Sequence, residues 1–130
     1  FISYVLIETY NQNIISPFFI ALLLWYPSFE LLFSILRKFN FNKSPMAPDT
    51  NHLHQLIYLF IQKRFVKNAI KSNNITSFLI NFYNLSIFFI GSLNYNNSEI
   101  QISLILVSVL FYIIIYRNLI TWKLKSVVPK

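Results

Sequence analysis

All eleven lysines and arginines of this chain fall on one side of a membrane when its apolar stretches are taken as spanning helices. The connections on the opposite side, Thr9 to Ser16 and Asn94 to Glu99, contain neither residue type. Cytoplasmic segments of multi-pass membrane proteins carry an excess of lysine and arginine, so the pattern predicts such a protein and its orientation. Segment 39–72 and the C-terminus would face the cytoplasm. The basic residues are Arg37, Lys38, Lys43, Lys63, Arg64, Lys67, Lys71, Arg117, Lys123, Lys125 and Lys130.

The composition agrees with a membrane location. Hydrophobic residues make up 55% of the chain and charged residues 12%, whereas soluble domains typically carry about 25% charged residues. The net charge is +7, and the basic residues that cause it lie beside apolar stretches rather than along a soluble face. This favours membrane lipids and phosphorylated substrates over nucleic acid as partners. The absence of cysteine excludes disulfides and thiolate metal sites.

The apolar pattern predicts an all-α fold, a polytopic bundle of transmembrane helices. Phe1–Glu8 has the composition of the end of one span. We therefore expect residues 1–130 to form a single membrane domain, the C-terminal part of a larger protein. Three further stretches come close to the roughly 20 residues that cross a bilayer. They are Pro17–Lys38, which Ser16 can cap and Pro27 should kink, Ile75–Leu93 and Ile100–Tyr116.

Segment 39–72 is predicted to be a cytoplasmic loop followed by a helix in the membrane interface. Pro45, Pro48 and several small polar residues indicate an ordered loop, and Asp49 stands where a helix N-cap is expected. Apolar and basic residues then alternate at helical spacing as far as Lys71. A helix with one apolar and one basic face prefers the interface to a path across the bilayer.

Polar side chains inside the predicted spans mark candidate functional positions. Glu30 precedes Arg37 by two helical turns, which places it roughly 10 Å into the membrane. An ionisable side chain at this depth faces either a water-filled cavity or a buried basic partner, so both a site role and a structural role remain open. Ser77, Asn81 and Asn84 form a stripe on another span, and such groups are expected to face other helices.

His52 and His54 are the other candidates. Imidazole can donate to phosphate, bind metal or transfer protons near neutral pH. A His-x-His pair without thiolates or clustered carboxylates is a weak metal signal, so no metal site is predicted in this chain. The pair follows the proline-containing loop and precedes the basic helix, which suits a phosphorylated soluble substrate approaching a membrane-bound one. The basic face of that helix is better explained by attraction to anionic lipid.

Several motifs in a fixed order resemble a known family. They are Ser16-Pro17, Trp25-Tyr26-Pro27, Phe29-Glu30, Arg37-Lys38, Lys43-Ser44-Pro45, Pro48-Asp49 and His52-Leu53-His54-Gln55-Leu56. Together they resemble the C-terminal part of the polyprenyl-phosphate N-acetylhexosamine-1-phosphate transferases. These membrane enzymes are related to phospho-N-acetylmuramoyl-pentapeptide transferase. The resemblance covers Glu8 to Tyr58 and continues as a helix pattern to the C-terminus.

The resemblance implies a reaction. UDP-N-acetylhexosamine would give its sugar 1-phosphate to polyprenyl phosphate at the cytoplasmic membrane face, releasing UMP, and the product would start a cell-envelope glycan. Magnesium would bridge the diphosphate, with its ligands on loops that precede this chain. We therefore expect the 130-residue piece alone to be inactive. The expected substrate-binding residues are His52, His54, Asp49, Glu30 and Lys43.

One departure and two alternatives qualify this interpretation. Many members of the family have a histidine where this chain has Gln55, which favours substrate binding over direct catalysis for the motif. A transporter fragment would use Glu30 and the polar stripe as pathway residues, but it leaves the polar residues of the loop unexplained. A non-catalytic membrane subunit or a decayed gene fragment is compatible with a missing upstream part.

Overall fold

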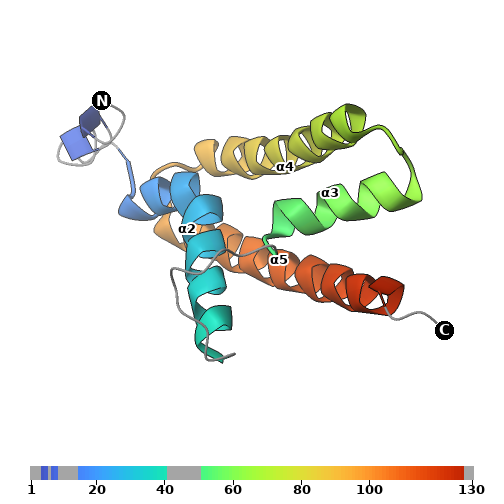
Figure 1. The fold of residues 1–130 in the computed structure, drawn as a ribbon. Coiled ribbons are helices and arrows are strands. Elements are labelled where there is room, and N and C mark those ends of the chain that lie inside the picture. The colour runs from blue at the N-terminus through green and yellow to red at the C-terminus, as the bar shows by residue number, and fades with distance from the viewer. Residues whose placement is uncertain (1–3, 6, 9–14, 41–50, 128–130) are drawn as a thin grey trace.

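The computed structural model describes residues 4–5, 7–8, 15–40 and 51–127, and these form an all-α bundle without strands (Figure 1). Tyr4, Val5, Ile7 and Glu8 are helical, as predicted for the end of an apolar helix. The predicted fold class is therefore confirmed. The longer helices are α2 (Pro17–Asn40), α3 (Leu53–Arg64), α4 (Ala69–Ser92) and α5 (Ser98–Val127).

Three of these helices are long and apolar enough to cross a membrane. The candidate spans are Pro17–Phe39, Ala69–Ser92 and Ser98–Ser126. Large apolar side chains cover their outer faces: Phe78, Phe82 and Leu110, for example, are 60–66% exposed. Such faces are stable against lipid and costly in water. With 12 residues, α3 is about 18 Å long and too short to cross.

The chain enters α2 and bends inside it where its sequence predicts. Ser16 Oγ accepts a hydrogen bond from Phe18 N at 3.2 Å, and Pro17 occupies the first helical position. Pro27 lies inside the helix, and Figure 1 shows the second half of α2 turning away from the first. Proline lacks an N–H and its ring crowds the preceding turn, which explains the bend. Glu30 follows the bend by about one turn.

The junction between α3 and α4 differs from the sequence prediction. The predicted basic helix extends to Lys71, whereas α4 already begins at Ala69. The Asn68 side chain accepts a hydrogen bond from Lys71 N at 3.1 Å, and the Ser72 hydroxyl donates to Val66 O at 2.7 Å. Side-chain capping therefore starts the helix well before the apolar run that marks the span.

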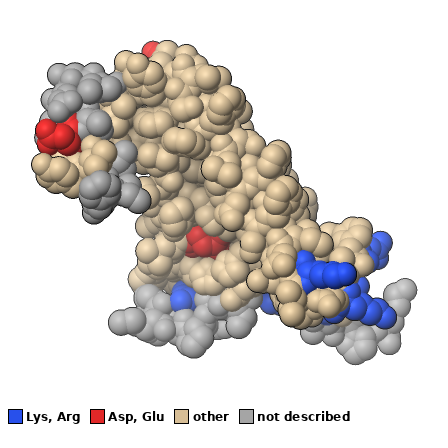
Figure 2. All heavy atoms as spheres, turned by 90° about the horizontal axis from the view of Figure 1, so that it is seen from above, with Lys and Arg blue, Asp and Glu red and all other residues tan. Residues whose placement is uncertain are grey.

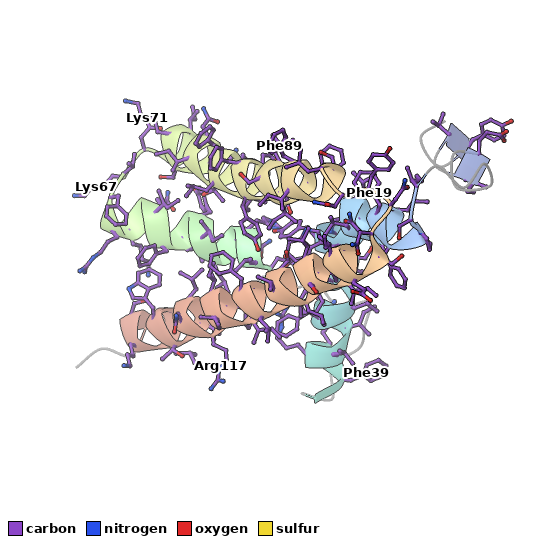
Figure 3. The ribbon with its side chains drawn as sticks, turned by 180° about the vertical axis from the view of Figure 1, so that it is seen from behind. Phe19, Phe39, Lys67, Lys71, Phe89 and Arg117 are labelled. Atoms are coloured by element: carbon purple, nitrogen blue, oxygen red, sulfur yellow. The ribbon has the colours of Figure 1, made fainter. Side chains whose placement is uncertain are left out.

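The basic residues of the α3–α4 turn and the α4–α5 turn lie at opposite ends of α4. On the face seen in Figure 2, lysines and arginines lie in separate places along the lower edge of the view. Figure 3 shows Lys67 and Lys71 near the α3–α4 turn, where they point away from the bundle. At the α4–α5 turn, the Ser16 hydroxyl lies 2.8 Å from the Ser98 hydroxyl and Ser16 N donates to Tyr95 O at 3.0 Å. The start of α2 is thus joined to this turn.

Aromatic side chains of α2 and α5 fill the centre of the bundle. Tyr112 is 2% exposed, and its ring centroid lies 5.0 Å from that of Phe29 and 5.5 Å from that of Phe33. Leu53 and Leu56 of α3 belong to the same buried cluster. Because α3 contributes to this core, it packs against both α4 and α5, between which it lies in Figure 1.

Replacing Gln101 by leucine should destabilise the α4–α5 turn. Gln101 is fully buried, and its side-chain amide donates to Gly91 O and to Asn94 O, both at 2.8 Å. Leucine would remove the side-chain donor from both carbonyls, which would keep only their backbone donors, Asn94 N and Asn97 N, at a cost of about 1–2 kcal/mol. Unfolding in detergent, followed by circular dichroism, measures the change. Ser103→Leu, at an exposed position on the same helix, is the control, and equal stability of the two variants would contradict the assigned hydrogen bonds.

Candidate functional site

The carboxylate of Glu30 holds the N-terminus of α3. Its Oε1 accepts a hydrogen bond from Leu53 N at 2.9 Å and lies 3.0 Å from His52 Nδ1. The first amides of a helix lack intrahelical partners and carry partial positive charge, so a carboxylate is stabilised there. The Glu30 side chain is only 12% exposed. The His52 side chain at the N-cap makes no capping hydrogen bond. The cap of α3 is therefore supplied by Glu30, a residue of α2.

The same contact sets the protonation of one nitrogen of His52. An ionised carboxylate accepts hydrogen bonds and donates none, so the contact with ionised Glu30 selects the form of His52 in which Nδ1 carries the hydrogen. The other ring nitrogen is then an acceptor in the neutral ring and a donor in the imidazolium. The ring of His54 stacks on that of His52, with centroids 5.6 Å apart and planes 13° apart. Because Glu30 holds His52, it also positions His54 through this stack.

Three buried polar atoms lie together beside this anchor. They are Glu30 Oε2 and the hydroxyl oxygens of Tyr26 and Tyr112, and none makes a hydrogen bond of standard geometry among the described residues. Both hydroxyls are close enough to the Glu30 carboxylate to donate weakly to it. A polar ligand at this place would therefore compete with the two hydroxyls for the carboxylate.

Two basic side chains approach the same region from different helices. Lys123 of α5 donates from Nζ to Asn51 Oδ1 at 2.6 Å, directly before His52 in the chain. Arg37 of α2 donates from a guanidinium nitrogen to the Tyr116 hydroxyl at 2.7 Å. Lys123 therefore holds positive charge beside the start of the histidine pair, whereas Arg37 is fixed at Tyr116, and the charge of Lys123 favours an anionic ligand.

An apolar cavity of about 480 Å³ lies among all four helices. Its walls include Trp25 and Tyr26 of α2, Leu53 of α3, Tyr83 of α4 and Ile115 of α5. None of the described residues that line it is charged. An apolar hollow of this size inside a membrane bundle can accept a hydrocarbon chain.

A second hollow, which we call the α3–α4 groove, has a volume of about 640 Å³, and polar side chains stand among its largely apolar walls. Tyr26 and Ile80 line both the groove and the apolar cavity, so the two hollows adjoin at these residues. Among the described residues, no lysine, arginine, aspartate or glutamate lines the groove. Its polar lining consists of His54, Gln55 and Tyr58 on α3 and Asn73, Thr76, Ser77 and Asn81 on α4, together with Tyr26.

The structure brings together three of the five expected substrate-binding residues. Glu30, His52 and His54 form one cluster, whereas Lys43 and Asp49 lie outside the described residues. The expected helix start after Asp49 is too early, because α3 begins at Leu53 with His52 at the N-cap. The capping carboxylate comes from another helix, which no local pattern reveals.

Other contributors were not among the five expected substrate-binding residues. Of the polar stripe on α4, Ser77 and Asn81 line the groove, whereas Asn84 donates to Ile80 O at 3.0 Å within its own helix. Tyr26 and Lys123 were not singled out, because a tyrosine in an apolar span and a lysine in a basic tail are both common. Only the approach of separate helices gives them a place at the site.

The described part of the cluster does not fit a magnesium ion. No group of three or more histidine, aspartate or glutamate side chains able to hold a metal occurs among the described residues. Glu30 is the one described carboxylate of the cluster, and its Oε1 is directed at two nitrogen atoms. Magnesium prefers several oxygen ligands in octahedral geometry. The cluster is suited instead to holding and orienting polar or anionic groups.

No protein-family model, curated protein or solved structure matches this chain. Its functional interpretation therefore depends on the residues and the geometry described above.

Proposed function

We propose that this chain is part of a membrane transferase that moves a sugar 1-phosphate from a UDP-sugar to polyprenyl phosphate. By its resemblance the sugar is an N-acetylhexosamine. The reaction would take place at the cytoplasmic face of the cytoplasmic membrane and start a cell-envelope glycan. The observation that carries the proposal is the junction at Tyr26 of an apolar cavity and a polar groove, beside the histidine cluster. A lipid-linked and a water-soluble substrate can meet at such a junction.

The chemistry of this transfer matches what the residues can do. An oxygen of polyprenyl phosphate attacks the phosphorus that bears the sugar, the bond from this phosphorus to the bridging oxygen breaks, and UMP leaves with that oxygen. Negative charge is spread over the phosphoryl oxygens, so catalysis depends on positioning and electrostatic stabilisation. His54 would donate to a phosphoryl oxygen, while Lys123 supplies positive charge nearby. The resemblance places the magnesium ligands on loops that precede residue 1.

The proposal assigns the two hollows to the two substrates. The apolar cavity would hold the first part of the polyprenyl chain, and the phosphate of that lipid would point toward Glu30 and the histidines. Glu30 would not contact substrate through Oε1, because this oxygen faces Leu53 N and His52 Nδ1. It would act as a positioning residue, which keeps the start of α3 and both imidazoles in place.

Replacing His54 by alanine should lower transfer about 10-fold, because a hydrogen bond to a charged phosphate contributes about 1.5–3 kcal/mol. The measurement is the incorporation of labelled sugar from UDP-N-acetylglucosamine into the lipid extract of membranes that contain the complete gene product. Gln62→Ala is the matched control, since Gln62 lies on α3 and lines neither hollow.

Two results would count against the proposal. Unchanged transfer by His54→Ala, with normal membrane insertion by alkaline extraction, would remove this histidine from the site. If the inserted wild-type protein transferred no sugar phosphate from any UDP-N-acetylhexosamine, the enzyme assignment would be wrong. A transporter fragment or a non-catalytic subunit would then be the better explanation.

A further inference from the structure

We infer that the α3–α4 groove holds the sugar ring of the nucleotide sugar, so that Gln55, Asn73 and Asn81 determine sugar specificity; this rests on the proposed function. The resemblance alone places no substrate in this groove. The inference comes from the chemistry of the side chains that line it and from its position beside His54.

The lining of the groove selects for a neutral polar ligand. Among the described residues that line it, the polar side chains are amides, hydroxyls and one imidazole, with no lysine, arginine or carboxylate. A phosphate in this groove would lack the charged partners that usually bind it. A hydrocarbon chain would leave the amides of Asn73 and Asn81 without hydrogen-bond partners. A sugar ring is uncharged, and its hydroxyls and acetamido group can form hydrogen bonds with these amides.

The polar side chains stand on both walls of the groove, which favours a sugar over a nucleobase. Gln55 and Tyr58 belong to α3, while Asn73, Ser77 and Asn81 belong to α4. A planar base presents its hydrogen-bonding groups along one edge, whereas a sugar presents them around the whole ring. Donors and acceptors on two facing walls therefore match a sugar better.

Two further observations indicate that the groove has an occupant. Gln55 Oε1 is buried without a hydrogen-bond partner among the described residues. Ser77 and Asn81 are exposed although they lie in the apolar run of a helix that can cross a membrane. Unpaired amides at such positions are costly, so a ligand that hydrogen-bonds to them would be stabilised.

The position of His54 connects the groove to the reaction. His54 lines the groove and stacks on His52, which Glu30 holds. A sugar in the groove would place its 1-phosphate at His54 and its ring along α4. The phosphate would then lie near the junction with the apolar cavity, where the lipid phosphate is proposed to arrive.

The test compares the affinities of UDP-N-acetylglucosamine and UMP for the complete gene product in detergent, measured by titration calorimetry. Asn73→Leu, Asn81→Leu and Gln55→Leu should each weaken binding of the UDP-sugar about 10-fold and leave binding of UMP unchanged. Asn74→Leu is the matched control, because Asn74 is an exposed asparagine next to Asn73 that does not line the groove. Circular dichroism checks that each variant remains folded. Because the variants lie on two helices, the test still gives a result if one of them fails to fold.

Each other outcome has a definite meaning. Equal weakening for UMP and the UDP-sugar would place the nucleotide in the groove and overturn the inference. If all three variants bound both ligands as the wild type does, the groove would have no part in substrate binding, while the proposed function would stand. A wild-type protein that bound neither ligand would refute the proposed function along with the inference.

Discussion

Replacing Glu30 by leucine should lower sugar-phosphate transfer about 100-fold. The substitution removes the acceptor for Leu53 N and for His52 Nδ1, so the first turn of α3 and both stacked imidazoles lose their anchor. Two charge-assisted hydrogen bonds together can contribute the roughly 2.7 kcal/mol that corresponds to this factor. Glu30→Gln keeps one acceptor oxygen without the charge and should lose about 10-fold. The transfer of labelled sugar to lipid measures both.

A second measurement separates positioning from direct contact with substrate. The Leu53 amide is protected from hydrogen exchange by Glu30 Oε1, so its exchange in the substrate-free protein should become faster in Glu30→Leu. Glu99→Gln, which changes an exposed carboxylate at the start of α5, should alter neither exchange nor transfer. If Glu30→Leu abolished transfer while Leu53 exchanged at the wild-type rate, Glu30 would act on substrate and not through α3.

The fold was largely predictable because apolar runs long enough to cross a bilayer are a strong signal. All three complete spans of the prediction correspond to helices in the structure. The ends of the helices were less predictable, since hydropathy marks where a helix meets lipid and not where its hydrogen bonds begin. The helix α5 continues to Val127, well past the predicted end at Tyr116, because basic and polar residues sustain a helix outside lipid.

The candidate site was predictable as separate residues and not as an arrangement. An acidic residue inside a span and a histidine pair after a proline-containing loop are visible in the sequence, so Glu30, His52 and His54 were all selected. Their contact was not visible, because it depends on how α2 bends and on where the chain returns to begin α3. The hydrogen bond between Lys123 and Asn51, which are 72 residues apart, was not predictable for the same reason. Local patterns carry no information on which distant segments meet.

Replacing Tyr112 by alanine should reduce the free energy of unfolding by about 3–5 kcal/mol, the range for deleting a buried aromatic ring. Tyr112 is 2% exposed and contacts the rings of Phe29, Phe33 and Tyr26. Alanine would leave a cavity where α2 packs on α5, and lipid could not fill it without separating the helices. Unfolding by sodium dodecyl sulfate in mixed micelles, followed by circular dichroism, measures the change.

Two matched variants identify which part of Tyr112 matters. Tyr112→Phe should cost less than about 1 kcal/mol, because the ring is kept and the hydroxyl makes no hydrogen bond of standard geometry among the described residues. Leu110→Ala, at a position that is 60% exposed, should also have little effect, since no core cavity forms. A loss in Tyr112→Ala no larger than in Leu110→Ala would contradict the aromatic core. If Tyr112→Phe lost as much as Tyr112→Ala, the hydroxyl would be bonded to Glu30, and the polar cluster would be closed in the resting protein instead of open to substrate.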